Sequence, residues 1–316
     1  MPLKTALKWA LVALGGALVA IAILAVLFPR PAAEIGLALE RSRAGLEVRT
    51  MQAAGVEIAY LEGGQGEPLL LVHGFGADKD NWTRVAGRLT SHYRVIAVDL
   101  PGFGDSGKPI DRRYRIQDQV ENLHSIIQAL GLKTLHLGGS SMGGQIVASY
   151  AARYPQAVRS LWLLAPLGVA TAKPSEMFRQ MEGLGPEARM PLIARTPEDF
   201  RSVFDLVFFK APMDLRAAIP YLADRAVANH KLHERIFQEL RDESIPLENL
   251  IGGSPVPARI VWGEQDRVLD SSGAKILAGL MPKSSVFMVP DAGHLPMVER
   301  PRLVARDYLK FRASLP

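Results

Sequence analysis

The chain has 316 residues, of which 48% are hydrophobic and 22% charged, and it contains no cysteine. This length allows one large α/β domain with an insertion or two smaller domains, and the lack of cysteine excludes disulfides, thiolate metal sites and a cysteine nucleophile. The formal net charge is +5, but three positive charges and no acid lie within residues 1–30. The remaining chain is nearly neutral and carries no basic stripe with interleaved aromatics, so nucleic-acid binding is not expected.

The first 30 residues contain an uncharged apolar segment, Trp9 to Phe28. A helix of this length spans about 30 Å, the thickness of the hydrocarbon core of a bilayer. The alternative is a cleaved signal peptide, whose apolar region would be shorter and would end at a site of small residues. Because this segment ends in Phe28-Pro29-Arg30-Pro31 instead, we predict that residues 1–30 form a retained, single-pass membrane anchor.

The charges that flank the apolar segment indicate its orientation. Lys4, Lys8 and the amino terminus precede it, whereas Arg30 follows it. By a small margin, the positive-inside rule favours a cytoplasmic amino terminus and a catalytic domain on the non-cytoplasmic side. Residues 31–44 are expected to form a short helix with apolar residues on one side. It either lies on the membrane surface or packs on the domain as a linker.

From residue 45 onward, short apolar or alternating segments are followed by segments with helical spacing. The expected strands cover residues 46–51, 56–61, 69–72, 93–98, 135–137, 158–164, 259–262 and 285–289. The expected helices cover residues 82–89, 116–130, 145–150, 274–280 and 298–311. This alternation predicts an α/β fold with a mostly parallel sheet and helices on both of its faces.

The alternation stops at residue 167, and no convincing strand follows before about residue 255. The segment Thr196–Asp199 is typical of a helix start, with an N-cap, a proline and acids in the first turn. An apolar stripe with helical spacing follows at Phe200, Val203, Phe204, Val207 and Phe208. We expect residues 167–254 to form a helical cap, or lid, inserted into an α/β core of residues 45–166 and 255–316. Most of the stripe should pack within this cap, and part of it should face a substrate.

The candidate nucleophile is Ser141, in the segment Gly139-Ser140-Ser141-Met142-Gly143. A strand precedes this G-x-S-x-G motif and a helix follows it, which is the arrangement of a nucleophile elbow. Such a turn is so tight that the residues two before and two after the serine must be small. The motif alone is weak, so its interpretation depends on a base, an acid and an oxyanion hole elsewhere in the chain.

A serine hydroxyl needs a base to take its proton and an acid to orient that base, in the chain order serine, acid, histidine. Of the seven histidines, His294 alone combines this order with a loop that directly follows an expected strand. Asp266 and Glu264 both lie in the loop after the preceding strand. We favour Asp266, because Gly263 lets the chain turn and an aspartate three residues later can point back over the sheet.

An oxyanion hole needs two backbone N–H groups directed at the developing negative charge. Met142, which follows the nucleophile, is expected to supply one of them. Phe75 is expected to supply the other, because His73-Gly74-Phe75-Gly76 follows an early strand and its glycines allow the amide to turn inward. His73 and the Gly-rich turn at Asp99–Ser106 are interpreted as structural. The sequence has neither metal-ligand spacing nor a dinucleotide fingerprint, so no cofactor is expected.

Several longer segments resemble one superfamily. They are His73–Trp82, Gly139–Gln145, Thr196–Glu198, Val261–Asp270 and Pro290–Pro301, the last ending in Val298-Glu299-Arg300-Pro301. Over residues 45–316 the chain resembles the α/β-hydrolase superfamily and, within it, the membrane-anchored monoacylglycerol lipases. The resemblance implies an eight-stranded sheet, a triad of Ser141, Asp266 and His294, a glycerolipid or acyl-ester substrate and an N-terminal membrane span.

We therefore expect a membrane-anchored serine hydrolase that cleaves esters of fatty acyl chains through an acyl-enzyme on Ser141. Its expected partners are the lipid substrate and the bilayer, with no obligate protein partner. One alternative is a hydrolase of small soluble esters or of carbon–carbon bonds that uses the same triad. Another is a non-catalytic membrane-binding module on the same fold.

Overall fold

The computed structural model describes residues 7–9, 15–16, 28–182, 190–242 and 245–315. Its centre is an eight-stranded sheet with the strand order β1-β2-β4-β3-β5-β6-β7-β8. The strands are β1 (Glu47–Ala53), β2 (Val56–Gly63), β3 (Glu67–Val72), β4 (Tyr93–Val98), β5 (Leu135–Ser140), β6 (Val158–Leu164), β7 (Ala258–Gly263) and β8 (Ser284–Val289). The β1–β2 and β2–β4 pairs are antiparallel, and the other pairs are parallel. The predicted mostly parallel α/β sheet is confirmed.

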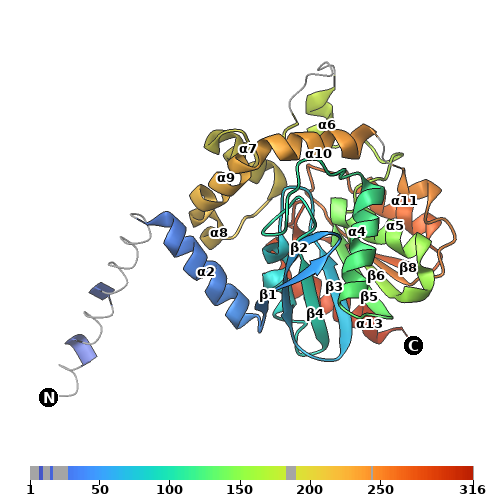
Figure 1. The fold of residues 1–316 in the computed structure, drawn as a ribbon, viewed down its shortest axis with the longest axis horizontal. Coiled ribbons are helices and arrows are strands. Elements are labelled where there is room, and N and C mark those ends of the chain that lie inside the picture. The colour runs from blue at the N-terminus through green and yellow to red at the C-terminus, as the bar shows by residue number, and fades with distance from the viewer. Residues whose placement is uncertain (1–6, 10–14, 17–27, 183–189, 243–244, 316) are drawn as a thin grey trace.

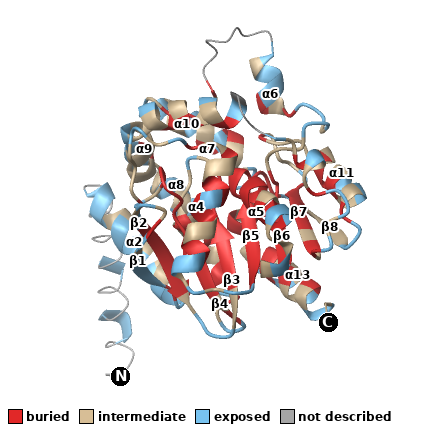
Figure 2. Cartoon of the chain, turned by 45° about the vertical axis from the view of Figure 1, so that its right-hand side comes forward, coloured by how far each residue is buried: buried red, intermediate tan, exposed pale blue. Residues whose placement is uncertain are grey.

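Helices cover both faces of the sheet, so its central strands are buried on both sides (Figures 1 and 2). In β3, Leu70 and Val72 join the apolar layer on one face, while Leu69 and Leu71 join the layer on the other. The first face carries α4 (Ile116–Ala129), α5 (Met142–Arg153) and α11 (Ser272–Leu280). The second carries α3 (Thr83–Ala86), α12 (Pro296–Glu299) and α13 (Pro301–Ala313). A continuous apolar run thus forms a strand because it fills two layers at once.

A group of helices lies between β6 and β7 in the chain and covers one end of the sheet (Figure 1). It consists of α6 (Glu176–Met181), α7 (Pro197–Val207), α8 (Met213–Ala217), α9 (Ile219–Ala228), α10 (His230–Asp242) and the short η3 (Leu247–Asn249). We call this group the cap. Thr196 and Asp199 begin α7 with a reciprocal capping box, in which each side chain accepts the backbone N–H of the other residue. The predicted helix start is therefore confirmed.

Two expected helices have other boundaries in the structure. The terminal helix predicted over residues 298–311 is divided into α12 and α13 at Arg300. Arg300 leaves the helical region, with φ −130° and ψ 48°, because the ring of Pro301 disfavours the helical conformation in the preceding residue. The helix predicted over residues 82–89 is replaced by η1 (Lys79–Trp82) and α3, which ends at Ala86. Beyond it, Arg88 and Leu89 donate to carbonyl groups only three residues earlier, as in a turn.

The helix expected near residues 31–44 is present as α2 (Pro29–Arg43). Polar contacts hold it to the domain: Arg30 pairs with Asp224 of α9 at 2.8 Å, and Arg41 forms two hydrogen bonds with Asp80. Ile35 on the same helix stays 62% exposed. The helix therefore packs on the domain and still presents apolar side chains to its surroundings.

No helix among the described residues is both long enough and apolar enough to cross a membrane. Most of the predicted span, Trp9 to Phe28, lies outside the described residues.

The turn from β5 into α5 requires glycine on both sides of Ser141. A Cβ atom on Gly139 would lie 2.3 Å from the Gly143 carbonyl oxygen, because the strand and the helix cross at this point. A Cβ atom on Gly143 would lie 2.3 Å from the carbonyl oxygen of Val72 and 2.4 Å from that of His73. All of these obstacles are backbone atoms, which cannot rotate away as a side chain can.

We therefore expect Gly143→Ala to lower the free energy of unfolding by about 2–3 kcal/mol, the upper part of the range for overpacked sites. The matched control is Gly279→Ala in α11, where a Cβ atom meets nothing within 4 Å. That variant should gain about 0.5–1 kcal/mol through its better helix propensity. Urea unfolding of both variants measures the difference, and equal midpoints would contradict this account of the turn.

Candidate active site

Ser141 lies between β5 and α5 in a strained backbone conformation. Its φ of 54° and ψ of −120° fall outside the regions that non-glycine residues favour. Two backbone bonds from the next strand and its loop hold this geometry: Ser141 N–H donates to Leu164 at 3.0 Å, and Leu167 N–H donates to Ser141 at 2.9 Å. The turn lifts the serine out of the strand, and its side chain lines a cavity beneath the cap.

His294 and Asp266 form a close pair beside this cavity. His294 Nδ1 lies 2.8 Å from Asp266 Oδ2, and both side chains are almost completely buried. The other carboxylate oxygen, Oδ1, accepts the backbone N–H groups of Val268 and Leu269 at 2.9 and 3.0 Å. Because the carboxylate cannot donate, the proton of this pair belongs to Nδ1, and Nε2 is the nitrogen left for other partners.

The structure brings Asp266 to His294 and leaves Glu264 exposed at the surface. Ser141 and His294, which are far apart in the sequence, line the same cavity. The predicted nucleophile, base and acid are thus gathered in one place, at the carboxyl ends of β5, β7 and β8. This is the end of a parallel sheet at which loops assemble functional sites.

The two predicted oxyanion-hole residues, Phe75 and Met142, both belong to segments that adjoin Ser141. A Cβ atom on Gly74 would lie 3.2 Å from Ser141 Cβ and 3.8 Å from Ser141 Oγ, so the backbone leading into Phe75 runs beside the hydroxyl. Met142 is the first residue of α5, and the N–H of a first helical residue has no acceptor within its helix. The positive end of the α5 dipole also favours negative charge at this position.

His73 connects two loops and takes no position facing the cavity. Its Nδ1 lies 2.7 Å from the Gly74 carbonyl oxygen, and its Nε2 accepts the Leu100 N–H at 3.1 Å. These partners assign the proton to Nδ1. Burial lowers the pKa of His73 to about 4, so the ring is neutral near pH 7. Its observed role is to hold the Gly74–Phe75 loop against the loop after β4, which agrees with the structural interpretation of His73.

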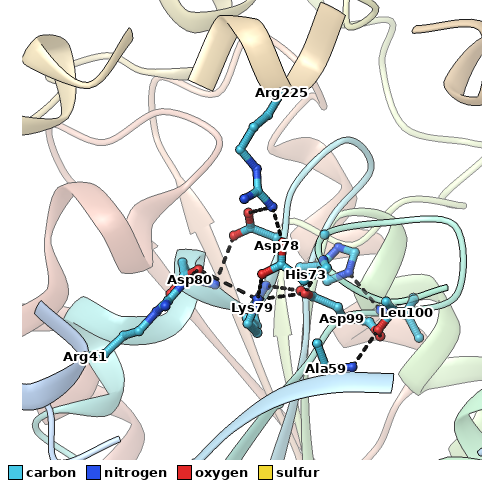
Figure 3. A network of polar contacts seen from close by, with 12 residues as sticks. Arg41, Ala59, His73, Asp78, Lys79, Asp80, Asp99, Leu100 and Arg225 are labelled. Carbon is cyan, nitrogen blue, oxygen red and sulfur yellow. Dashed lines mark hydrogen bonds and ion pairs between the residues drawn. The ribbon is translucent and has the colours of Figure 1, made fainter. Parts of the chain in front are cut away.

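A buried ionic network supports the same two loops (Figure 3). Lys79 Nζ lies 2.8 Å from Asp99 and 2.6 Å from Asp105, and the Lys79 and Asp105 amides also donate to Asp99. Burial alone would lower the pKa of Lys79, but the carboxylates outweigh it and raise that pKa above its ordinary value. Burial would likewise raise the pKa of Asp105, yet Lys79 and Arg225 lower it to about 2.

Arg225 extends this network into the cap. It comes from α9 and contacts Asp105 at 2.8 Å. It also lies 3.7 Å from Asp78 (Figure 3). Neither Lys79 nor Arg225 is expected from the sequence to support the site. Lys79 lies within the segment that resembles known hydrolases, but its type and spacing do not show that its ammonium is fully buried. Arg225 reaches the network only because α9 packs over the core, and the local sequence does not show that packing.

The cavity has a volume of about 230 Å³ and two chemically different walls. Its apolar wall comes largely from the cap: Leu192, Phe200, Val203, Phe204, Val207, Phe208, Leu215 and Leu222. Its polar wall comes from α2, the segment from the loop after β3 through η1 to α3, and α9 with its C-cap: Glu40, Asp78, Asp80, Asn81, Arg84, Arg225 and Asn229. All five residues of the predicted apolar stripe line the cavity. More of the stripe faces the cavity than expected, while its three phenylalanine rings also pack on one another within the cap.

His233 of α10 also lines the cavity, although no motif in the sequence marks it as a site residue. Its ring stacks on Phe103 at 5.3 Å and lies 5.6 Å from the ring of Phe75. Burial lowers its pKa to about 4. The sequence of α10 could have indicated that His233 is buried, because a histidine on the apolar face of a helix is directed toward the core. Among the described residues, no cluster of histidine and carboxylate side chains is placed to hold a metal ion.

The fold and the site together define an α/β hydrolase. A family model described as alpha/beta hydrolase fold matches residues 67–301, and the chain belongs to that family. It is 37% identical over 281 residues to Lipase 3 of Moraxella sp. (strain TA144), a match that covers 87% of this chain and 88% of the relative. It is 31% identical over 288 residues to monoacylglycerol lipase ABHD6 of Homo sapiens, covering 87% and 85%.

A solved structure is also similar over nearly the whole chain. It is that of a membrane phospholipase A described as a novel bacterial virulence factor. The two chains are 42% identical, the TM-score is 0.86, and the match covers 97% of this chain and 98% of the other. Because the match covers nearly all of both chains, it includes the core and the cap.

The pairing of Asp266 with His294 predicts a selective effect of the acid. Asp266→Asn allows the histidine to settle in the wrong tautomer, and we expect the rate of ester hydrolysis to fall by about 10³–10⁴-fold with little change in KM. Glu264→Gln removes the nearby exposed carboxylate and should leave the rate unchanged. Steady-state kinetics on a soluble ester, with thermal unfolding as a folding control, compares the variants. Equal losses in both would reject Asp266 as the acid.

The buried histidines predict that the fold loses stability in mild acid. Unfolded His233 binds a proton near pH 6.5, whereas the folded form does so only near pH 4. The stability that depends on neutral His233 is therefore fully present above pH 6.5 and is lost as the pH drops toward 4, because the unfolded chain gains the proton first. His233→Phe should flatten this decline by at most roughly 3 kcal/mol, measured as urea midpoints against pH. Replacing the exposed His92 by glutamine should leave the wild-type curve unchanged.

Proposed function

We propose that this chain is a membrane-anchored serine hydrolase of carboxylic esters with a fatty acyl chain, with monoacylglycerol as the first candidate substrate. The observation that carries the proposal is one cavity that joins Ser141 and the Asp266–His294 pair to an apolar wall from the cap. The relatives that are lipases, monoacylglycerol lipases and a phospholipase support the same chemistry.

In the proposed reaction, Ser141 Oγ attacks the ester carbonyl carbon while His294 Nε2 takes its proton. Asp266 keeps the imidazole in the tautomer that presents Nε2 and stabilises the imidazolium that forms. The Phe75 and Met142 amides donate to the oxyanion, which carries most of the charge in the transition state. The imidazolium protonates the leaving alcohol, and an acyl-enzyme remains on Ser141. Water activated by His294 then attacks this ester and releases the fatty acid.

The apolar wall is the proposed binding site of the acyl chain. The α7 residues on this wall, with Leu215 and Leu222, offer aromatic and aliphatic surface and no charge. Each methylene group that the wall removes from water contributes about 0.8 kcal/mol, roughly a fourfold gain per methylene. Affinity for the substrate should therefore rise with chain length until the cavity is filled.

The polar wall is the proposed binding site of the alcohol half. Asn81 and Asn229 provide amide groups, and Asp78 and Arg225 provide an acceptor and donors within the same wall. Free hydroxyl groups, as on a monoacylglycerol, can both donate to and accept from such a set. A fully apolar alcohol would displace water from these groups without offering them a hydrogen bond, which costs free energy.

The proposed anchor, residues 1–30, would hold the catalytic domain near lipid that partitions into the bilayer. The α2 helix supports this placement, because Ile35 and Leu39 stay 62% and 50% exposed on the segment that follows the anchor. We propose the division into an anchor, a juxtamembrane helix over residues 31–44, a core of residues 45–166 and 255–316, and a cap of residues 167–254. The non-cytoplasmic side remains the proposed location of the domain.

An active-site-directed fluorophosphonate tests the nucleophile directly. The full-length protein in detergent should be labelled at Ser141, and Ser141→Ala should not be labelled. Hydrolysis of monoacylglycerols from C4 to C18 then tests the substrate class, with kcat/KM rising with chain length. Absence of labelling would favour the non-catalytic alternative. Labelling together with a preference for acetyl esters and no action on monoacylglycerol would favour a hydrolase of small soluble esters.

A further inference from the structure

The segment Val298-Glu299-Arg300-Pro301 contains a carboxylate whose function the proposed reaction leaves unassigned. Glu299 accepts three backbone hydrogen bonds from two separate parts of the chain. Its Oε1 accepts the Gly293 N–H at 2.7 Å, in the loop that carries His294. Its Oε2 accepts the N–H groups of Phe209 and Lys210 at 3.0 and 2.6 Å, in the cap just after α7.

These bonds join two segments that already touch. The His294 N–H donates to the Val207 carbonyl oxygen at 2.9 Å, so the backbone of the proposed base is bonded directly to the end of α7. A Cβ atom on Gly293 would lie 2.7 Å from that same oxygen and 2.8 Å from the Phe209 nitrogen. The two backbones approach so closely that only glycine fits, and Glu299 lies beside the contact.

Glu299 is itself held by the core. It ends α12, whose Met297 and Val298 are buried in the apolar layer that also contains Trp82 and Val85. Burial raises the pKa of Glu299, while the three backbone donors act in the opposite direction and favour the charged form. The carboxylate is thus a fixed acceptor in a mostly shielded place, and the cap and the histidine loop are aligned to it.

An ion pair also joins the segment after α7 to the loop that carries His294, and it provides a comparison. Lys210 Nζ pairs with Asp291 at 3.1 Å, but both side chains are more than half exposed. Water and salt screen such a pair, and exposed pairs contribute little to structure. Glu299 differs because its oxygens meet backbone amides that cannot swing away.

We propose that Glu299 is a positioning residue for His294. Asp266 sets the tautomer and the ring plane, and Glu299 sets where the backbone of the histidine lies relative to the cap and hence to Ser141. Because Val207 and Phe208 line the acyl wall and the next two amides bind Glu299, the same carboxylate ties the position of that wall to the position of the base. This inference rests on the proposed function, since it requires His294 to be the base.

The variant Glu299→Gln tests this role with almost no change in size. A glutamine has one acceptor oxygen, so either Gly293 or the cap amides lose their partner. On a short soluble ester, which makes little use of the acyl wall, we expect kcat to fall by 10–100-fold and KM to stay within about twofold. Glu299→Asp keeps the charge and should recover part of the rate. Lys210→Met removes the exposed pair across the same boundary and should keep the wild-type rate.

A double-mutant cycle with Asp266→Asn distinguishes positioning from general stability. If both carboxylates act through His294, the double variant should be far less impaired than the product of the two single effects. Rates are divided by the fraction of protein that the fluorophosphonate finally labels, so that unfolded molecules do not count. A kcat of Glu299→Gln within twofold of wild type, or fully multiplicative effects in the cycle, would overturn the inference alone. Failure of the wild-type protein to label would overturn the proposed function and this inference with it.

Discussion

The turn at Ser141 is the constraint on which the other features of the site depend. A strand becomes a helix within one residue, and the backbones of β3, β5 and α5 approach so closely that Gly139 and Gly143 cannot carry a side chain. This crossing places a strained serine at the carboxyl end of the sheet and directs a helix N-terminus at it. The strain is tolerated because the buried parallel strands around it are packed on both faces.

Buried polar groups hold the loops around that serine in fixed positions. Desolvating Lys79 and Asp99 is costly, and the cost is offset here because they bond to each other, to the half-exposed Asp105 and to nearby amides at short distances. The neutral His73 adds two further bonds between the same loops. These groups do not face the proposed chemistry. They fix the loop that leads into Phe75, the residue proposed to donate one of the oxyanion-hole amides.

The cap is attached to the core by contacts that reach the site itself. Arg225 bonds to the ionic network on one side of the cavity, and Glu299 bonds to the end of α7 on the other. Between these attachments, the α7 residues form an apolar wall above Ser141. A cap fastened in this way shapes the cavity and also limits how far the histidine loop can move. The proposed binding of an acyl chain and the proposed alignment of the base therefore depend on the same set of contacts.

Local patterns in the sequence determined the strands, the α7 start and the elbow at Ser141, because side-chain periodicity, capping and turn chemistry act between near neighbours. The order of serine, acid and histidine followed from the same patterns. Tertiary structure decided the rest. It formed the hydrogen bond between His294 and Asp266, which the sequence had only favoured over Glu264, turned the α7 stripe toward the cavity and buried Lys79. These outcomes depend on how segments distant in the chain pack against one another, and the residue types at any one position do not contain that information.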